Sequence, residues 1–307
     1  MHVLQIVTTA SPFFEQQVEA LEARGVDCTT VEVPDADGTP ATLDAYRQFY
    51  QRVLREGIGS YDLVHANYGL VGPFALAQPT RPVVLSLWGS EVLGESRRLT
   101  AVSTAAARAS DAVVLPSEPI SRAFDVPHRV IPFPVDTETF RPIPRAAARQ
   151  QVDWEPDPRI VLFPYHPDRG VKNYPRAERI VAAVDDRIED PVELRWIWGV
   201  PHDEVPLYMN ASDAVLVTSD HESGPMVVKE AAACNVPVVS TDVGFASAVL
   251  DGVEHSHVCS ADEGFVDALT DVLAAGERSN GTSTLELPDS ERTGERLHDV
   301  YRSVVEA

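Results

Sequence analysis

Two glutamates that flank an expected helix start are the residues best suited to chemistry in this sequence. Residues 219–230 read SDHESGPMVVKE, and Pro225 after Gly224 is typical of the first turn of a helix. Glu222 then lies just before the helix and Glu230 about five residues into it, so both carboxylates can border one ligand. A carboxylate accepts hydrogen bonds from vicinal hydroxyls, which sugars and riboses supply. Taken alone, this spacing more often reflects one capping and one solvated glutamate.

The start of the same helix predicts a site for an anion. The N–H groups of Met226 and Val227 lie at the positive end of the helix dipole, where a diphosphate can bind. Lysine occurs only at Lys172 and Lys229 in the whole chain. Because Lys229 is next to Glu230, it either belongs to the site or points to solvent.

Short β-branched runs alternate with longer amphipathic segments, which predicts parallel sheets covered by helices. In the first half, strands are expected at 2–8, 27–33, 63–66, 83–87, 112–115 and 129–131, with helices at 13–24 and 43–56. After a proline-rich segment, a second series has strands at 160–163, 193–198, 214–218 and 236–240, a loop at 276–290 and a last helix at 291–307. We therefore predict two α/β domains whose ligands bind at the carboxyl ends of the strands, beside a cleft between the domains.

The composition is strongly acidic, with 47 Asp and Glu against 25 Lys and Arg, a net charge of -22. Such a surface makes nucleic acid a poor partner. Since arginine supplies nearly all the positive charge, we also expect a salt-loving source, in which molar salt screens the self-repulsion.

The sequence further predicts a soluble cytoplasmic protein, at most peripheral at the inner face of a membrane. Cys28, Cys234 and Cys259 are far apart and odd in number, which is typical of reduced core cysteines. The run from His2 to Thr8 has no basic leader, and no apolar stretch approaches the length of a membrane span.

Several motifs in order along the chain resemble one enzyme family. Residues 222–244 are similar to the E-x7-E signature of retaining GT-B glycosyltransferases of the GT4 family (glycosyl transferases group 1). Residues 130–142, VIPFPVDTETFRP, resemble the family's VIPNGVDxxxFxP stretch, and residues 199–213 resemble the segment before the motif strand. Trp88 to Glu91 falls where members carry H-G-x-D/E. The resemblance covers about residues 64–244.

The resemblance implies a GT-B architecture, with two Rossmann-like domains whose parallel sheets face each other across a cleft. The acceptor-side domain would be 1–142 and the donor-nucleotide domain 143–290, with helix 291–307 packing back on the first domain. The implied activity is a hexosyltransferase-type reaction: transfer from a UDP-, GDP- or other nucleotide sugar to a hydroxyl acceptor, with retention of anomeric configuration.

The resemblance also implies roles for individual residues. Glu222 would hold donor-sugar hydroxyls, Glu230 the ribose, and Arg169 with Lys172 the diphosphate, where fixed cations stabilise charge that develops in the transition state. The remaining donor contacts would come from Ser223, Gly224, Pro225, Met226, Val227, Val200 and Trp88.

Two departures from the family pattern keep an alternative open. Trp88 stands where many members have a histidine, and the loop from Thr8 to Phe14 lacks the usual paired glycines. A non-catalytic, glycosyltransferase-like subunit that binds nucleotide sugars, or regulates, is therefore the alternative. A second enzyme alternative is a GT-B relative such as a sugar-nucleotide epimerase or a phosphorylase; the phosphorylase is disfavoured because only two lysines could carry its pyridoxal phosphate.

No cofactor and no essential metal are expected. Asp35-Ala-Asp37 has a D-x-D pattern but reads as a surface turn, and His255-x-His257 reads as a strand end.

The acceptor is barely addressed by the sequence; it could be a sugar or a lipid-linked molecule. The segment from Tyr46 to Arg55 places aromatic side chains at helical spacing among arginines. It would either pack on the first sheet, which is the favoured interpretation, or lie against a membrane.

Overall fold

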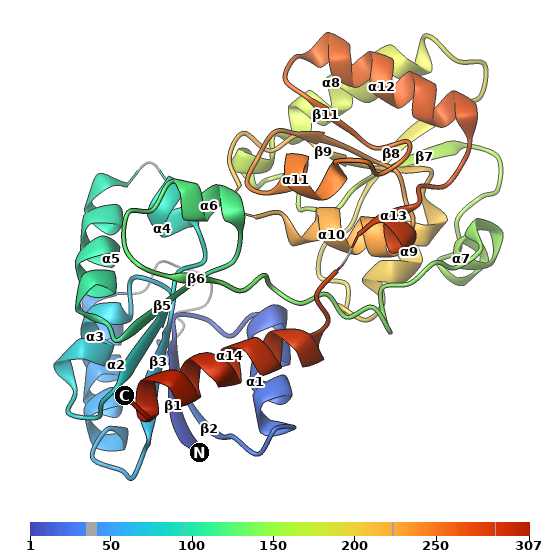
Figure 1. Cartoon of the computed structure of the whole chain (residues 1–307). Helices are drawn as coiled ribbons and strands as arrows, with labels where there is room; N and C mark the ends of the chain where they lie inside the picture. The colour runs from blue at the N-terminus through green and yellow to red at the C-terminus, as the bar shows by residue number, and fades with distance from the viewer. Residues whose placement is uncertain (35–41, 95, 223, 286) are drawn as a thin grey trace. The chain divides into compact units, whose positions relative to one another are not determined.

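The computed structural model describes residues 1–34, 42–94, 96–222, 224–285 and 287–307 (Figure 1). It divides into two compact units. Unit 1 comprises residues 1–134 and 288–307, and unit 2 comprises residues 135–287.

Unit 1 is built on a six-stranded parallel sheet of order β2-β1-β3-β4-β5-β6. Its strands are β1 (His2–Val7), β2 (Asp27–Glu32), β3 (Leu63–Asn67), β4 (Val83–Ser86), β5 (Ala112–Leu115) and β6 (Arg129–Val130). Its helices are α1 (Pro12–Glu22), α2 (Leu43–Glu56), α3 (Gly72–Ala77), α4 (Ser90–Leu93), α5 (Arg97–Ala109), α6 (Glu118–Arg122) and α14 (Ser290–Val305).

Helices cover both faces of this sheet, so its strands are apolar on both sides. Leu4 of β1 packs with α2, α3 and α5 on one face, whereas Val3 packs with α1 and α14 on the other (Figure 1). Helix α2 begins at an N-cap, where the Thr42 hydroxyl accepts a hydrogen bond from the Ala45 N–H at 3.2 Å. Phe49 on its inner face is fully buried in the core. The apolar face of α2 is thus used in packing on the sheet.

A buried polar network attaches α14 to the sheet of unit 1. The Tyr301 hydroxyl lies 2.7 Å from Nδ1 of His65 and accepts a hydrogen bond from Nε2 of Gln5 at 3.1 Å. Nε2 of His65 lies 2.7 Å from the Ser86 hydroxyl, and Asn67 donates to Gln5 at 2.8 Å. Every polar group in this chain of contacts meets a protein partner, which removes the cost of burying it.

Unit 2 has a five-stranded parallel sheet of order β11-β10-β9-β7-β8. Its strands are β7 (Arg159–Phe163), β8 (Val192–Trp196), β9 (Ala214–Val217), β10 (Val238–Thr241) and β11 (His257–Cys259). Its helices are α7 (Arg145–Gln151), the short 3-10 helix η1 (Gly170–Lys172), α8 (Tyr174–Asp185), α9 (Val205–Ala211), α10 (Met226–Ala233), α11 (Ala246–Leu250), α12 (Asp262–Ala275) and α13 (Gly281–Thr284).

The strand order of unit 2 fixes where a ligand can bind. The chain moves from β7 outward to β8 and then returns to place β9 on the other side of β7. Loops that follow β7 and β9 therefore diverge at this point, leaving a crevice at the carboxyl ends of the strands. Helices α8 and α12 cover one face of the sheet, and α9, α10 and α13 the other (Figure 1).

The units meet at residue 134 rather than at the expected residue 142, and unit 2 ends at 287 rather than 290. The physical reason for the first difference is that Val135 and Phe140 are buried in the core of unit 2. The chain from Val135 onward, which includes the end of the VIPFPVD motif, therefore belongs to unit 2. The last helix, α14, packs its Leu297, Val300 and Tyr301 into unit 1.

Most expected strands are present within one or two residues, and α2 and β5 have the expected bounds. β8 ends at Trp196 instead of Trp198, so Trp198 lies in a loop. Of the cysteines, Cys234 is buried while Cys28 and Cys259 are half-buried, and all three are free thiols.

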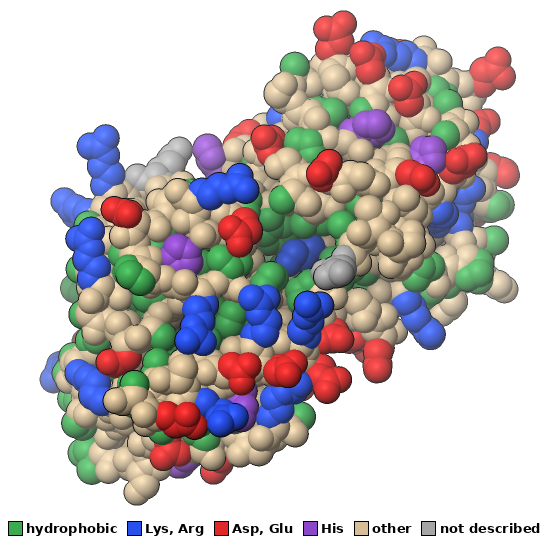
Figure 2. Space-filling view, in the orientation of Figure 1, with side chains coloured by type: hydrophobic (Ala, Val, Ile, Leu, Met, Phe, Trp, Pro, Cys, Tyr) green, Lys and Arg blue, Asp and Glu red, His purple; other side chains and the backbone are tan. Residues whose placement is uncertain are grey.

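The surface carries many carboxylates on both units, while arginines are gathered mainly over unit 1 on the face shown in Figure 2. Among the described residues, no helix is long and apolar enough to cross a membrane.

Candidate functional site

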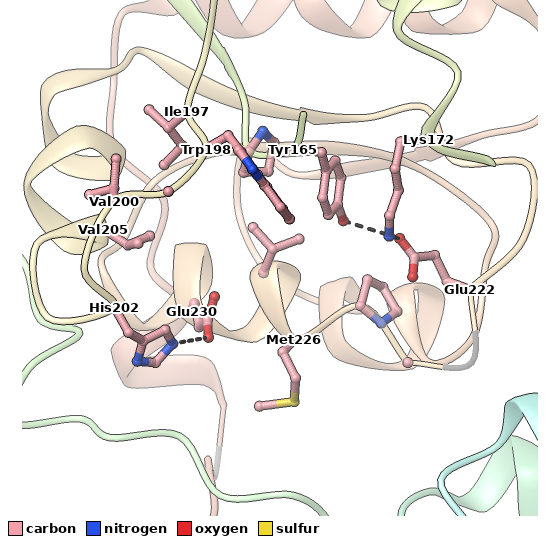
Figure 3. Close-up of a pocket in the computed structure, with 15 residues that line it drawn as sticks. Tyr165, Lys172, Ile197, Trp198, Val200, His202, Val205, Glu222, Met226 and Glu230 are labelled. Atoms are coloured by element: carbon pink, nitrogen blue, oxygen red, sulfur yellow. Dashed lines mark hydrogen bonds and ion pairs between the residues drawn. The ribbon is translucent and has the colours of Figure 1, made fainter. Parts of the chain in front are cut away.

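A pocket of about 410 Å³ lies at the carboxyl ends of β7, β8 and β9 in unit 2 (Figure 3). It is formed by the loops after these strands and by the start of α10. Its lining residues are Pro164, Tyr165, Lys172, Ile197, Trp198, Gly199, Val200, His202, Val205, Glu222, Gly224, Pro225, Met226, Val227 and Glu230. The residues predicted from the sequence that line this pocket are Lys172, Val200, Glu222, Gly224, Pro225, Met226, Val227 and Glu230.

Glu222 and Lys172 form an ion pair at one end of the pocket (Figure 3). The same oxygen, Oε1 of Glu222, also accepts hydrogen bonds from the Tyr165 hydroxyl at 3.1 Å and the Ser219 hydroxyl at 2.9 Å. The Lys172 ammonium lies 4.0 Å from the centre of the Tyr165 ring. Both charged side chains are largely buried, so they are attracted more strongly than a surface pair.

The environment of this pair changes the proton affinity of its members. Burial lowers the pKa of the Lys172 ammonium, and the adjacent Glu222 carboxylate partly opposes that change. Burial and the charge of Glu222 raise the pKa of the Tyr165 phenol well above its usual value. Tyr165 is therefore a neutral donor throughout the physiological range.

Hydrogen bonds between the two loops hold this end of the pocket in place. The Thr218 hydroxyl, at the end of β9, donates to the carbonyls of Lys172 at 3.0 Å and Asn173 at 3.1 Å. Asn173 adopts a left-handed conformation with φ of 55°, and its side chain donates to Asp220 at 2.9 Å. Since Asn tolerates this conformation better than most residues, the turn after η1 is well suited to its sequence.

The start of α10 approaches a phenyl ring closely. A Cβ atom at Gly224 would lie 2.2 Å from Cε1 of Phe245, so only glycine fits there. Pro225 is the N-cap and the helix begins at Met226, one residue later than the sequence suggested. Met226 and Val227, the first two residues of the helix, thus line the pocket.

Lys229 does not point to solvent, and that alternative is wrong. Its side chain is buried, with the ammonium 4.6 Å from the centre of the Phe245 ring. Burial lowers its pKa to about 8. The reason is that α10 is enclosed on most sides, so position 229 faces protein rather than water.

Glu230 lies at the other end of the pocket, on the second turn of α10 (Figure 3). Its Oε1 is 3.1 Å from Nε2 of His202, and its side chain is largely buried. His202 comes from the loop between β8 and α9, and the hydrogen bond with Glu230 raises its pKa. Val200, on the same loop, lines the pocket as well.

Arg169 and Trp88 lie elsewhere. Arg169 is not among the described residues that line the pocket; its guanidinium lies 6.0 Å from the ring centre of Trp198, which does line it. Trp88 belongs to unit 1, where its ring centre lies 4.8 Å from that of Phe13 and 5.6 Å from that of Tyr68.

Glu91, the last residue of the motif that begins at Trp88, orders the loop after β4. This buried carboxylate accepts hydrogen bonds from the N–H groups of Gly69, Trp88 and Gly89, at 2.9, 3.0 and 2.8 Å. Burial raises its pKa. The motif therefore serves to fix the backbone around Trp88.

Some predicted positions cannot be placed. Ser223, Asp35 and Asp37 lie outside the described residues. His257 begins β11, and among the described residues there is no group of three or more His, Cys, Asp and Glu that could hold a metal ion.

Sequence reasoning missed Tyr165, Ser219 and Trp198 and left His202 without a role. Tyr165 and Trp198 stand two residues after β7 and β8, and Ser219 two after β9. The rule that ligands bind at the carboxyl ends of parallel strands could have nominated them. The His202 contact depends on the path of a loop, which no local pattern fixes.

The chain is similar to known glycosyltransferases in sequence. Residues 183–283, which include Glu222 and Glu230, match the family model described as glycosyl transferases group 1. A lipopolysaccharide core biosynthesis mannosyltransferase of Rhizobium meliloti is 28% identical over 58% of this chain and 59% of its own length. A D-inositol 3-phosphate glycosyltransferase of Frankia alni is 26% identical over 87% of this chain and 79% of its own.

Solved structures extend the likeness to the whole fold. Sucrose-phosphate synthase of Thermosynechococcus elongatus has a TM-score of 0.82 at 18% identity, covering 100% of this chain and 99% of that one. HepE of Anabaena, solved with UDP and glucose, has a TM-score of 0.72 at 16% identity, covering 98% and 99%. The chain therefore has the GT-B fold of two Rossmann-like units, as expected, and its similarity to named glycosyltransferases supports a transferase.

Proposed function

We propose that this protein transfers a sugar from a nucleotide-sugar donor to a hydroxyl acceptor, with retention of anomeric configuration, as GT4 glycosyltransferases do. One observation carries the proposal: Glu222 and Glu230 stand at two ends of one pocket, with Lys172 and the start of α10 beside them. Two acceptors for hydroxyl groups flanking a source of positive charge match the order of sugar, diphosphate and ribose in such a donor.

In the proposed reaction Lys172 exchanges partners. In the structure its ammonium neutralises Glu222. A bound diphosphate would compete for the ammonium, and Glu222 could then accept hydroxyls of the donor sugar. As the bond to the leaving nucleoside diphosphate breaks, negative charge grows on the phosphate oxygens, where Lys172 and the N–H groups of Met226 and Val227 stabilise it. Arg169, beside Trp198, would join them by moving its guanidinium.

No side chain in the pocket is assigned as a nucleophile. In the mechanism of this family the leaving phosphate helps to deprotonate the incoming hydroxyl on the same face of the sugar. We propose that no metal takes part, because fixed positive groups already face the diphosphate.

Glu230 and Val200 would bind the nucleoside. Glu230 would accept the ribose hydroxyls, and the base would lie near Gly199 and Val200, which line the pocket at the end of β8. The presence of UDP and glucose with the related HepE structure supports a donor of this class.

A titration with nucleoside diphosphates and nucleotide sugars tests the proposal, followed by measurement of slow donor hydrolysis. Glu230→Ala should weaken binding of the preferred nucleotide by about 1–3 kcal/mol, the cost of a lost buried hydrogen bond. Unchanged affinity in this variant would overturn the assignment of the ribose. Nuclear magnetic resonance of the first product should show the anomeric configuration of the donor.

A nucleotide-sugar-binding protein without turnover is the second candidate. The observation that favours it is that Oε1 of Glu222 is already engaged by Tyr165, Lys172 and Ser219. If that set does not open, Oε1 of Glu222 is not available to the hydroxyls of the donor sugar. Binding of a nucleotide sugar without hydrolysis or transfer to any acceptor would establish this candidate.

A further inference from the structure

His202 contacts the carboxylate that the proposed function assigns to the ribose. Its Nε2 is 3.1 Å from Oε1 of Glu230, at the end of the pocket opposite the Lys172–Glu222 pair (Figure 3). The two residues are 28 positions apart and come from different elements, the loop after β8 and helix α10. Their contact is therefore a product of the fold of unit 2.

The surroundings hold the ring of His202 in this position. Its centre lies 5.0 Å from that of Phe140, which is almost completely buried. The backbone beside it is closed by a turn in which the Glu204 N–H donates to the Pro201 carbonyl at 3.0 Å. Phe140 and this turn limit the directions in which the ring can move, while 39% of the His202 side chain remains exposed.

Three acidic groups interact with the ring of His202. Glu230 contacts the ring, and Asp136 and Asp203 lie close enough to interact with it. The hydrogen bond and charge of Glu230, with the two aspartates, raise the pKa of His202 above its ordinary value, although burial opposes them. The ring therefore keeps its proton to a higher pH than a free histidine.

We propose that His202 is a positioning residue for the donor: it holds Oε1 of Glu230, so that Oε2 is presented to the ribose of a nucleoside diphosphate. This inference rests on the proposed function and adds a dependence on pH to it. When the ring is protonated, both nitrogens carry hydrogen and the charge attracts Glu230. When the ring is neutral, only one of its nitrogens carries hydrogen, so the attraction between charges is lost and only the Nε2–H tautomer still donates to Glu230. Affinity for the nucleotide should then fall as pH rises through the pKa of His202.

Two substitutions separate positioning from simple packing. His202→Gln keeps an N–H donor but cannot titrate, whereas His202→Ala loses both properties. A matched control is Glu277→Gln, which removes the charge from another histidine–glutamate contact in unit 2, that between His255 and Glu277 at 3.1 Å. Neither His255 nor Glu277 lines the pocket.

The test measures dissociation constants of UDP and GDP from about pH 6 to about pH 8.5, with Trp198 in the pocket as a fluorescent reporter. Near pH 6.5, His202→Ala should raise the dissociation constant about three- to tenfold, the worth of one net hydrogen bond. His202→Gln should stay within about twofold of the wild type there and lack its dependence on pH. The phosphates titrate equally in all variants, so the ratio to the wild type isolates the ring.

The outcomes are distinguishable. If the wild type binds no nucleoside diphosphate, the proposed function fails. If the wild type binds, Glu230→Ala binds weakly and His202→Ala is unchanged, only the present inference is overturned. Equal weakening in both His202 variants with the wild-type dependence on pH would show a packing role and would also overturn it. Thermal unfolding of each variant establishes that it is folded before binding is compared, and Glu277→Gln should match the wild type.

Discussion

The two units place polar residues differently around the point where their sheets reverse strand order. In unit 1, Gln5 and His65 lie within neighbouring strands, β1 and β3, and both contact the hydroxyl of Tyr301 in α14. In unit 2, Lys172 and Glu222 lie in the loops that follow neighbouring strands, β7 and β9, and line a pocket. The same type of sheet therefore carries a closed polar network in one unit and an open one in the other.

The difference shows how to distinguish structural from functional polar groups in a parallel sheet. A polar side chain inside a buried strand must find its partner in the helices that cover the sheet, and here all the partners are uncharged. A side chain after the strand's carboxyl end lies at the edge, where a ligand can replace its partner. Charge suits the second position, because the attraction can pass from protein to ligand.

Removing the cation from the open site should have the largest effect. Lys172→Ala should lower the rate of donor hydrolysis or transfer by about 100- to 1,000-fold, because one preorganised group that stabilises the leaving charge is lost. Steady-state rates against donor concentration measure this. Arg187→Ala is the control, since it breaks a surface ion pair with Asp267 at 2.6 Å in the same unit. A rate within about twofold of the wild type for Lys172→Ala would mean that the Glu222 pair is structural.

Each unit has a buried basic side chain, Lys229 in unit 2 and His65 in unit 1, and the two should change the free energy of unfolding in different pH ranges. Burial lowers the pKa of Lys229 to about 8, so between about pH 8 and its ordinary value of 10.5 the unfolded chain holds a proton that unit 2 has released. The free energy of unfolding of unit 2 should therefore rise with pH in that window, by on the order of 3 kcal/mol. Unit 1 has no lysine.

In unit 1 the corresponding group is His65, whose pKa burial lowers to about 3. Its contribution to stability is complete above about pH 6.5 and declines as pH falls toward 3. Hydrogen exchange of peptides from each unit, measured against pH, gives both curves. Lys229→Met should remove the alkaline rise in unit 2; a rise that persists in this variant would contradict the assignment.

Opening the closed network of unit 1 should lower stability without touching the pocket. Tyr301→Phe removes the buried hydroxyl that Nε2 of Gln5 and Nδ1 of His65 contact, which should lower the free energy of unfolding by about 1–3 kcal/mol. Tyr61→Phe is a matched control, because the contact of that hydroxyl with Glu56 is long, at 3.5 Å, and exposed. Denaturant unfolding measures the loss of stability, and UDP binding shows whether the pocket of unit 2 is affected. Weakened UDP binding by folded Tyr301→Phe would show that the two networks are coupled.

The sequence predicts most of this fold because hydrophobic runs and helix starts are local. β5 and α2 are examples, since four apolar residues and a capped amphipathic segment define them without reference to the rest of the chain. The boundary at residue 134 was missed because Val135 and Phe140 join the core of unit 2 through long-range packing. Short helices such as α13 have too few residues to show a period.

In the pocket, the motif residues were predictable and their neighbours were not. Glu222, Glu230 and Lys172 belong to patterns of type and spacing, and the structure places them together. The burial of Lys229 depends on Phe245, 16 residues later, which closes over α10. The contact of His202 with Glu230 likewise depends on the tertiary path of a loop, so no reading of adjacent residues could assign it.

The smallest expected effect concerns the overall charge of each unit. Unit 1 has 13 Arg against 20 Asp and Glu, a net charge of -7, whereas unit 2 has 12 Lys and Arg against 27 Asp and Glu, a net charge of -15. The arginines over unit 1 are visible in Figure 2. Self-repulsion destabilises the compact state, and it is screened over about 3 Å at 1 M salt but about 10 Å at 0.1 M.

Desalting should therefore loosen unit 2 more than unit 1. Hydrogen exchange at about 2 M and about 0.1 M potassium chloride would compare peptides of β7 and β9 with those of β1 and β3. Glu189 is exposed on unit 2, so Glu189→Lys should reduce the salt dependence there and leave unit 1 unchanged. Equal protection of both units at both salt concentrations would show that this acidic surface is tolerated without salt, and it would remove the argument for a salt-loving source.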